Sequence, residues 1–162
     1  MYNTTSGQKL ANARSYVRKY APYFSPTLYG LIPTPVEGLM RKVNSPIGVT
    51  ERLVLLYDPE WADKEHELVL AFALAHEIMH VQLNHITRGK AYTDKHRWNK
   101  AGDLFINGSL EAQTYPMREN GKIVESPVWR LPNWVLMPQK YGFPIGLTAD
   151  KYYQLLEEKR DS

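Results

Sequence analysis

Residues Leu68 to Leu83 form an almost uninterrupted apolar segment that contains the sequence His76-Glu77-Ile78-Met79-His80. A segment that is apolar on nearly all sides is typical of a helix that runs through a protein core. We expect this helix to begin after Asp63, as its N-cap, and to end at Arg88 and Gly89. Residues four apart lie on the same face of a helix, so the rings of His76 and His80 can meet at one metal ion.

The two histidines and the glutamate between them match the HExxH pattern of zinc enzymes. Glu77 lies about 100° round the helix from His76, beside such an ion, where it can act as a general base. Zinc accepts neutral nitrogen donors in tetrahedral geometry, and an open position lets it lower the pKa of a bound water to about 7. We therefore predict one zinc ion per chain, with His76 and His80 as ligands and Glu77 as the catalytic residue. The alternative is a helix that carries two histidines by chance.

A catalytic zinc site needs a third protein ligand. The chain has no cysteine, so this ligand must be His, Asp or Glu. His85 is disfavoured because it lies about 140° round the same helix from His80, and no glycine turns the chain back. The metzincin pattern also fails, since Ile86 stands where its third histidine belongs. A ligand from another helix is expected.

Residues Lys95 to Leu110 are predicted to form a second core helix with a polar stripe. Asn99, Asp103 and Asn107 follow one another at intervals of four residues and so share one face. An anionic side chain in a core must be paired or metal-bound, which favours Asp103 as the third zinc ligand. Asn107, with Asn99 on the same stripe, would then hydrogen-bond a ligating imidazole from outside the metal shell.

Several alternatives stay open at this point. The polar stripe could be a solvated face, Asp103 could only orient one of the two histidines, and His96 or Glu111 could be the third ligand. A side chain that stabilises the oxyanion is also needed, and the sequence does not choose among the candidates. These candidates are Tyr92, His96, Arg97, Tyr115 and Tyr141.

The other predicted elements are short. Helices are expected over 8–20 and 25–31, and a strand over 52–57 follows a weaker one. Asn120-Gly121 predicts a hairpin or irregular loops that cover the site, and Thr148 caps a terminal helix. The strand Leu53 to Tyr57 should be an edge strand to which an extended substrate can add. Together these elements predict an α+β, mainly helical protein, in which a small edge sheet packs beside the HExxH helix and a second ligand-bearing helix.

Composition limits the class of protein. The 162 residues are 43% hydrophobic and 23% charged, which predicts one domain over 1–162. The net charge of +3 is dispersed among acidic residues, so nucleic-acid binding is not expected. The N-terminus lacks a leader pattern and no run approaches the roughly 18 apolar residues of a membrane span, so a soluble, cytoplasmic protein is expected.

Several segments resemble the zinc metallopeptidase domain that is often found at the N-terminus of VWA-like bacterial proteins. The similar segments are PYFSPTLYGL, LVLLYDPEW, HEIMHVQLNH, RWNKAGDLFIN, LPNWVLMP and GLTADKYYQLLEE. The resemblance implies a minigluzincin-like zincin fold, with His76 and His80 as ligands, Glu77 as catalytic acid and base, and Asp103 as third ligand. The VWA-like domain that usually follows is missing, which fits a stand-alone version of the kind phages carry or a fragment. A VWA-like partner could then act in trans.

These observations predict zinc-dependent hydrolysis of a peptide or protein substrate. Peptide deformylase also carries HExxH, but it requires a cysteine ligand that this chain lacks. A rival from another class is a metal-stabilised binding or regulatory protein without turnover, which a fourth protein ligand such as His96 would favour. In a third interpretation no metal binds and the polar groups form a hydrogen-bonded core network.

Overall fold

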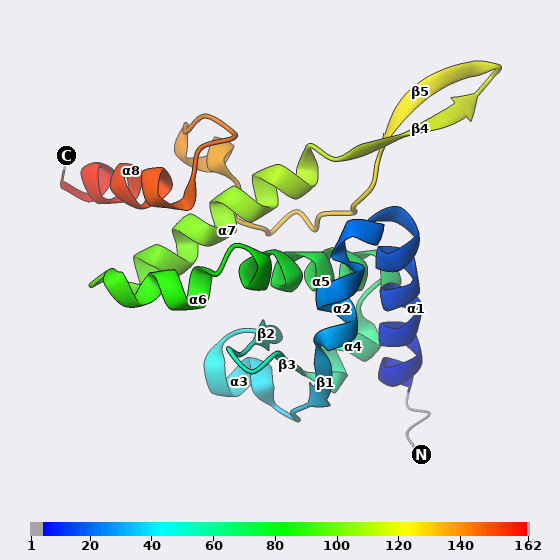
Figure 1. Ribbon diagram of the computed structural model, residues 1–162, viewed down its shortest axis with the longest axis horizontal. Coiled ribbons are helices and arrows are strands. Elements are labelled where there is room, and N and C mark those ends of the chain that lie inside the picture. The colour runs from blue at the N-terminus through cyan, green and yellow to red at the C-terminus, as the bar shows by residue number, and fades with distance from the viewer. Residues whose placement is uncertain (1–4, 162) are drawn as a thin grey trace. The chain divides into compact units, whose positions relative to one another are not determined.

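The computed structural model describes residues 5–161 of the chain. The chain divides into two compact units, Met1–Thr87 (unit 1) and Arg88–Ser162 (unit 2), and each is described by itself. Helices predominate and the strands form small sheets, which confirms the predicted α+β, mainly helical class (Figure 1). Across residues 5–161, no helix has the length and hydrophobicity that spanning a bilayer requires.

Unit 1 combines helices with one short sheet. Its helical elements are α1 (Thr5–Tyr20), the 3-10 turn η1 (Pro22–Phe24), α2 (Ser25–Gly30), α3 (Leu39–Val43), α4 (Pro59–Lys64), α5 (Glu67–Gln82) and α6 (His85–Arg88), of which the last residue belongs to unit 2. Its strands are β1 (Ile32–Pro35), β2 (Ile47–Val49) and β3 (Val54–Tyr57). The predicted helices over 8–20 and 25–31 are confirmed as α1 and α2, and the two predicted strands as β2 and β3. Helix α3 and strand β1 were not predicted.

Helix α5 lies in the core of unit 1. Its residues from Val69 to Ala75 are all buried, so this part of the helix turns no face to solvent. Helices α1 and α2 and strand β2 all contact it. The apolar segment therefore forms the core helix that its composition predicts, and packing on several sides holds the HExxH residues in place.

The predicted ends of the long helix were wrong. Asp63 lies inside the separate helix α4, and the N-cap of α5 is His66, whose Nδ1 accepts a hydrogen bond from the Leu68 amide at 3.1 Å. At the other end α5 stops at Gln82, and the chain adopts a left-handed conformation at Asn84, where φ is 57°. Asparagine tolerates this conformation better than most residues, and a new helix, α6, starts directly after it.

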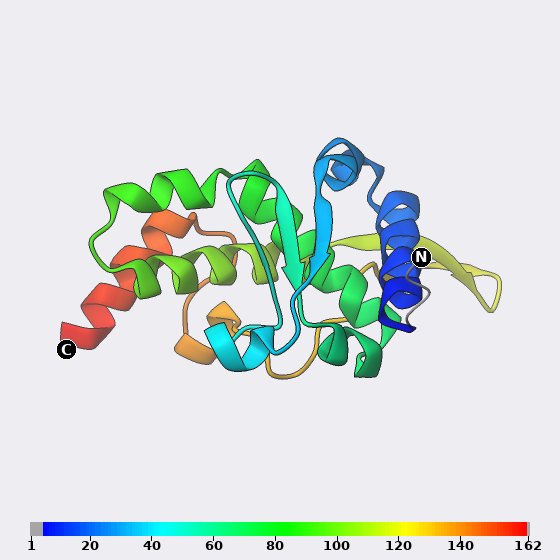
Figure 2. The ribbon, with the colours of Figure 1, turned by 90° about the horizontal axis from the view of Figure 1, so that it is seen from below.

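The sheet of unit 1 has the strand order β1-β3-β2. β3 is parallel to β1, beside which it runs in Figure 2, and antiparallel to β2. The expectation that Leu53 to Tyr57 forms an edge strand was therefore wrong, because β3 is the central strand. The edges are β1 and β2, which the chain reaches before it reaches β3.

The two edges differ in the backbone groups that they present. In β1, the amides of Ile32 and Val36 donate to β3, so by alternation Thr34 also faces β3 and Pro33 and Pro35 face outward. Proline has no N–H group, so this edge offers carbonyl acceptors but no donor at either position.

Edge strand β2 presents donors. Directly after β2, the Thr50 amide donates to the Val54 carbonyl of β3 at 3.0 Å, so Thr50 faces β3. Gly48, two residues earlier, faces β3 in the same way, and the N–H groups of Ile47 and Val49 point outward. Of the two edges, β2 is the one suited to accept a further strand.

Unit 2 consists of two long helices and a hairpin. Its elements are the 3-10 turn η2 (Gly89–Ala91), α7 (Lys95–Glu111), β4 (Thr114–Glu119), β5 (Lys122–Pro127), the 3-10 turn η3 (Pro138–Tyr141) and α8 (Ala149–Asp161). Three predictions are confirmed here: helix α7, helix α8, and the cap of α8 by Thr148, whose hydroxyl oxygen accepts from the Lys151 amide at 3.2 Å.

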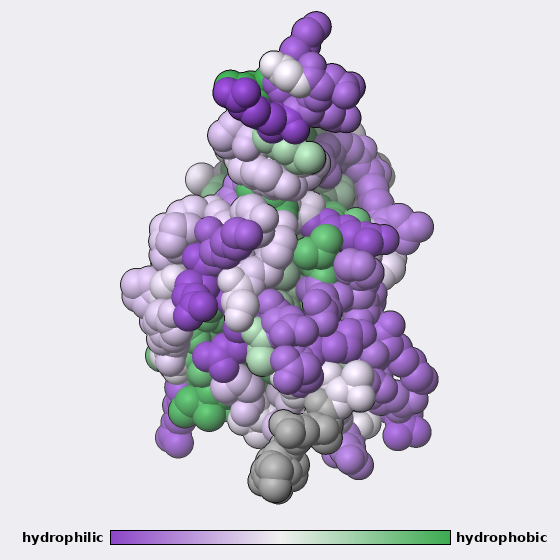
Figure 3. Space-filling model, turned by 90° about the vertical axis from the view of Figure 1, so that its right-hand side faces the viewer, coloured by the Kyte–Doolittle hydropathy of each residue, from purple (hydrophilic) through white to green (hydrophobic). Residues whose placement is uncertain are grey.

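The hairpin of β4 and β5 turns at Asn120 and Gly121. Both residues have positive φ, 51° and 77°, as a two-residue hairpin turn of this kind requires. The end of the hairpin, at the top of Figure 3, is mostly hydrophilic. The Asn-Gly signal in the sequence therefore predicted both the hairpin and its turn.

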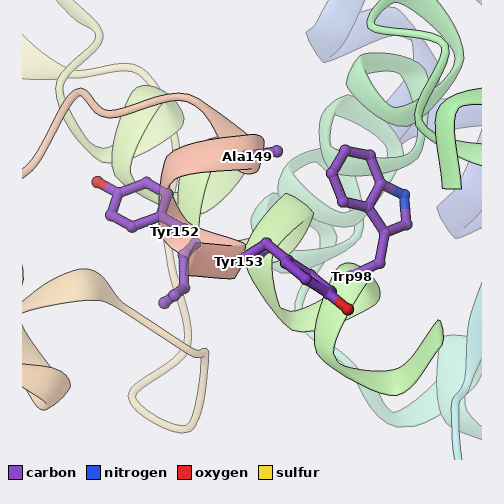
Figure 4. Close-up of a cluster of buried hydrophobic side chains, with 6 residues drawn as sticks. Trp98, Ala149, Tyr152 and Tyr153 are labelled. Carbon is purple, nitrogen blue, oxygen red and sulfur yellow. The ribbon is translucent and has the colours of Figure 1, made fainter. Parts of the chain in front are cut away.

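Helix α8 packs against α7 through a cluster that is rich in aromatic side chains. Its buried members are Trp98, Ala101, Leu104, Ala149, Tyr152 and Tyr153. Figure 4 shows Tyr153 of α8 reaching toward Trp98 of α7, with ring centroids 6.5 Å apart. On α7 the cluster extends from Trp98 to Leu104, the part of the helix that also carries Asn99 and Asp103.

Polar contacts connect the start of α8 with η2. Asp150 accepts hydrogen bonds from the Tyr92 hydroxyl and from the Arg88 guanidinium, and the ring of Tyr92 stacks on Trp98 with centroids 4.3 Å apart. Trp98 also fills the space beside Gly89, where an added Cβ would lie 2.6 Å from Cδ1 of the indole. The turn before α7 is thus fastened to both long helices of unit 2.

Candidate metal site

The two histidines of the HExxH sequence direct the same nitrogen atoms at each other. His76 and His80 lie on successive turns of α5, and their Nε2 atoms are 3.0 Å apart. The ring centroids are 4.7 Å apart, with planes at 75° to each other, and both residues are half-buried. Two imidazole nitrogens that converge in this way are arranged as a pair of ligands to one ion.

The second nitrogen of His80 faces a third histidine. Nδ1 of His80 lies 3.1 Å from Nδ1 of His85, and His85 is only 4% exposed. The expectation that His85 lies about 140° round the same helix was wrong, because α5 ends before Asn84 and the turn there brings the first residue of α6 back. Sequence reasoning therefore missed the partner of His80. The signal that was present is Asn84, a residue type that tolerates the left-handed conformation.

Glu77 follows His76 directly in α5 and is 7% exposed. A carboxylate taken out of water at this level costs free energy unless other groups interact with it. Its place directly after His76 puts this carboxylate on the helix that carries both histidines.

Residues Asn99, Asp103 and Asn107 all lie on α7 in unit 2, as predicted. They are not equivalent. Asn99 is exposed, Asp103 is half-buried, and Asn107 is 3% exposed. The side-chain amide of Asn107 donates to the carbonyl of Leu136 at 2.9 Å, which fastens the segment before η3 to the helix. The predicted role of Asn107 toward an imidazole stays a prediction.

The alternative third ligands have other environments. His96, near the start of α7, and Glu111, at its end, are both exposed. The side-chain amide of Gln139 lies 3.4 Å from Glu111 Oε1, within hydrogen-bonding distance. Asp103 is the least exposed of the three, and in its burial it resembles the two histidines of α5.

Several candidates for oxyanion stabilisation contact other side chains of unit 2. Tyr92 donates to Asp150, and Tyr141 stacks on Phe143 with centroids 5.3 Å apart. Arg97 forms ion pairs with Asp94 at 3.5 Å and with Glu157 at 3.9 Å. Tyr115 is half-buried in β4, and His96 is exposed. None of these environments singles out one of the five, and this role stays unassigned.

The donor set fits a metal ion. The converging Nε2 atoms of His76 and His80 are neutral nitrogen donors, a kind of donor that zinc accepts. A half-buried pair of histidines on a core helix, within a mainly helical α+β fold, defines the chain as a candidate metalloprotein.

The comparison with protein families agrees with this class. A family model described as "Putative metallopeptidase domain" matches residues 5–162, and the chain belongs to that family. The match spans residues of both units. Neither the curated proteins nor the solved structures contain a match to the chain. Membership of the family indicates metallopeptidase activity, and together with the histidine and aspartate donors it indicates a metal ion.

Proposed function

We propose that the protein is a zinc-dependent peptidase that hydrolyses peptide bonds with an activated water molecule. The observation that carries the proposal is the convergence of the His76 and His80 Nε2 atoms, 3.0 Å apart, on the buried helix of an HExxH sequence. Zinc is the metal of choice because the available donors are imidazole nitrogen and carboxylate oxygen, and the chain has no cysteine.

The third ligand in this proposal is Asp103. Three protein ligands leave one position for water, which is the arrangement of catalytic rather than structural zinc. In support, His76, His80 and Asp103 can each offer one ligand atom to a metal ion. His96 and Glu111 are weaker candidates, since a ligand atom has to leave solvent and both side chains are exposed.

The chemistry is divided between the metal and Glu77. When bound, zinc supplies Lewis acidity and lowers the pKa of its water to about 7. The Glu77 carboxylate accepts a proton from the attacking water and later delivers it to the leaving amine. His76 and His80 hold their positions through α5, whose packed core leaves the helix little freedom.

The substrate in this proposal is an extended peptide that adds to β2. The outward N–H groups of Ile47 and Val49 can donate to substrate carbonyls, main chain to main chain. Strand β2 also contacts α5, the helix that carries the HExxH residues. The β1 edge is excluded by its two prolines, Pro33 and Pro35, which have no amide hydrogen.

The decisive experiment compares the wild type with Glu77→Gln. Both proteins, loaded with zinc, are incubated with peptides from a digested bacterial proteome, and new peptide termini are identified by mass spectrometry. Glu67→Gln, the same change in the first turn of the same helix, is the matched control. We expect cleavage by the wild type and the control, and none by Glu77→Gln although it still binds zinc.

Two results would contradict the proposal. Undiminished cleavage by Glu77→Gln would remove Glu77 from the mechanism. Zinc binding without cleavage of any peptide by the wild type would favour the alternative, a metal-stabilised binding or regulatory protein of the same fold.

A further inference from the structure

The environment of His85 is set by the break between α5 and α6. Had α5 continued, His85 would face away from His80. Instead the left-handed residue Asn84 turns the chain, and the rings of His80 and His85 approach with centroids 5.2 Å apart and planes at 69°. The contact joins nitrogen to nitrogen, Nδ1 to Nδ1 at 3.1 Å, and not ring face to ring face.

We propose that His85 is a positioning residue that fixes the tautomer and orientation of the zinc ligand His80. This inference rests on the proposed zinc site. In this arrangement Nδ1 of His80 carries a proton and donates a hydrogen bond to Nδ1 of His85. The proton of His85 itself is on Nε2.

Two neutral imidazoles carry only two ring protons on nitrogen between them. Each ring has one N–H donor and one acceptor nitrogen, so a hydrogen bond between two Nδ1 atoms needs a proton on only one of them. A metal on Nε2 of His80 requires that this nitrogen has no proton. The proton of His80 is then on Nδ1, and Nδ1 of His85 must be the acceptor.

The same geometry excludes His85 as a ligand to the same ion. The Nδ1 and Nε2 atoms of an imidazole point in divergent directions. Nε2 of His80 faces His76, whereas Nδ1 faces His85. His85 therefore lies behind the ring of His80, on the side away from the ligand pair. The burial of His85, only 4% exposed, keeps water from taking its place.

An acceptor in this position has a measurable effect. Partners of metal-bound histidines orient the ring, and their loss typically weakens metal binding by about 10- to 100-fold. Most such partners are carboxylates, carbonyls or waters. A neutral imidazole adds no negative charge, so His85 should act on ring orientation and tautomer without changing the net charge of the site.

The experiment compares two substitutions of similar size. His85→Asn places Oδ1 close to the position of Nδ1 and keeps an acceptor, whereas His85→Leu removes it. Zinc affinity is measured by competition with a chromogenic chelator. We expect His85→Leu to bind zinc about 10- to 100-fold more weakly than the wild type, and His85→Asn to regain most of the loss. Circular dichroism of the metal-free proteins checks that both variants are folded.

A second measurement needs no variant. Nitrogen-15 NMR of the histidine side chains in the zinc-loaded wild type identifies which nitrogen of each ring carries a proton. We expect His80 to be protonated on Nδ1 and His85 on Nε2. Zinc on Nδ1 of His80, wild-type zinc affinity in His85→Leu, or equal losses in the Leu and Asn variants would each overturn the inference. A wild type that binds no zinc would overturn the proposed function as well.

Discussion

Nε2 of His76 and Nε2 of His80 lie 3.0 Å apart on successive turns of α5. Two lone pairs this close repel each other unless a proton or a metal ion lies between them, and the proposed function places a zinc ion there. We expect elemental analysis of the purified protein to find about one zinc per chain, and His80→Ala to lose it. His96→Ala is the control, because His96 is exposed and should not affect metal content. Zinc in His80→Ala at the wild-type level would contradict the site.

Asp103 can be distinguished from a residue that only orients a histidine. Loss of an outer partner costs about 10- to 100-fold in metal affinity, whereas loss of a ligand should cost more. We therefore expect Asp103→Ala to weaken zinc binding by more than about 100-fold, measured by chelator competition. Lys100→Ala, on α7 but outside the polar stripe, should bind zinc normally. A loss of only about 10- to 100-fold would mean that Asp103 orients a histidine and does not bind the metal.

The contact between Gly89 and Trp98 makes unit 2 sensitive to a single methyl group. A Cβ at Gly89 would lie 2.6 Å from Cδ1 of the indole, and Trp98 is 3% exposed and stacked on Tyr92, so it cannot easily move. We expect Gly89→Ala to lower the free energy of unfolding by about 1–3 kcal/mol in urea. Gly48→Ala, where a Cβ meets nothing within 4 Å, should change it far less. Equal stability of the two variants would show that the turn at Gly89 adapts.

The Asp150 contacts predict how stability depends on pH. The hydrogen bond from Tyr92, followed by the charge of Arg88, holds the pKa of Asp150 below its ordinary value in the folded protein. Asp150 therefore binds a proton more readily in the unfolded chain than in the folded protein. Its contribution to the free energy of unfolding is present above the unfolded pKa of about 3.9, and it is lost as the pH falls toward the folded pKa.

The expected result is a weaker acid dependence in the variants. Between pH 7 and pH 3, the free energy of unfolding should fall more for the wild type than for Asp150→Asn. Tyr92→Phe should lie in between, because this substitution removes the largest cause of the lowered pKa of Asp150. Urea unfolding at both pH values measures this difference. Identical pH dependence in all three proteins would show that the contact is absent in solution.

The elements that sequence predicted well are those in which a local signal decides the structure. The apolar residues of α5 could be satisfied only in a core, and Asn120-Gly121 supplies the positive φ values that the hairpin turn needs. The approach of the His76 and His80 rings follows from helical spacing alone. These parts of the fold and of the site needed no knowledge of distant neighbours.

The errors arose where tertiary structure overrides a local preference. Apolar residues continue to Ile86, so their pattern hides the break at Asn84 that brings His85 to His80. Pro33 and Pro35 argue against a strand, yet β1 tolerates them because their nitrogens face outward at an edge. His66 is not a preferred N-cap residue, and only the end of α4 at Lys64 shows why α5 starts there.

The unequal edges of the sheet in unit 1 also bear on self-association. A stack of strands grows without limit only if every added copy offers a new edge, as in fibrils. Here two copies could join through β2, but each would leave only its β1 edge outward, and the amide-free positions of Pro33 and Pro35 would halt further growth. The prolines thus confine any such association to pairs, and an edge that is open to a peptide does not expose the protein to polymerisation.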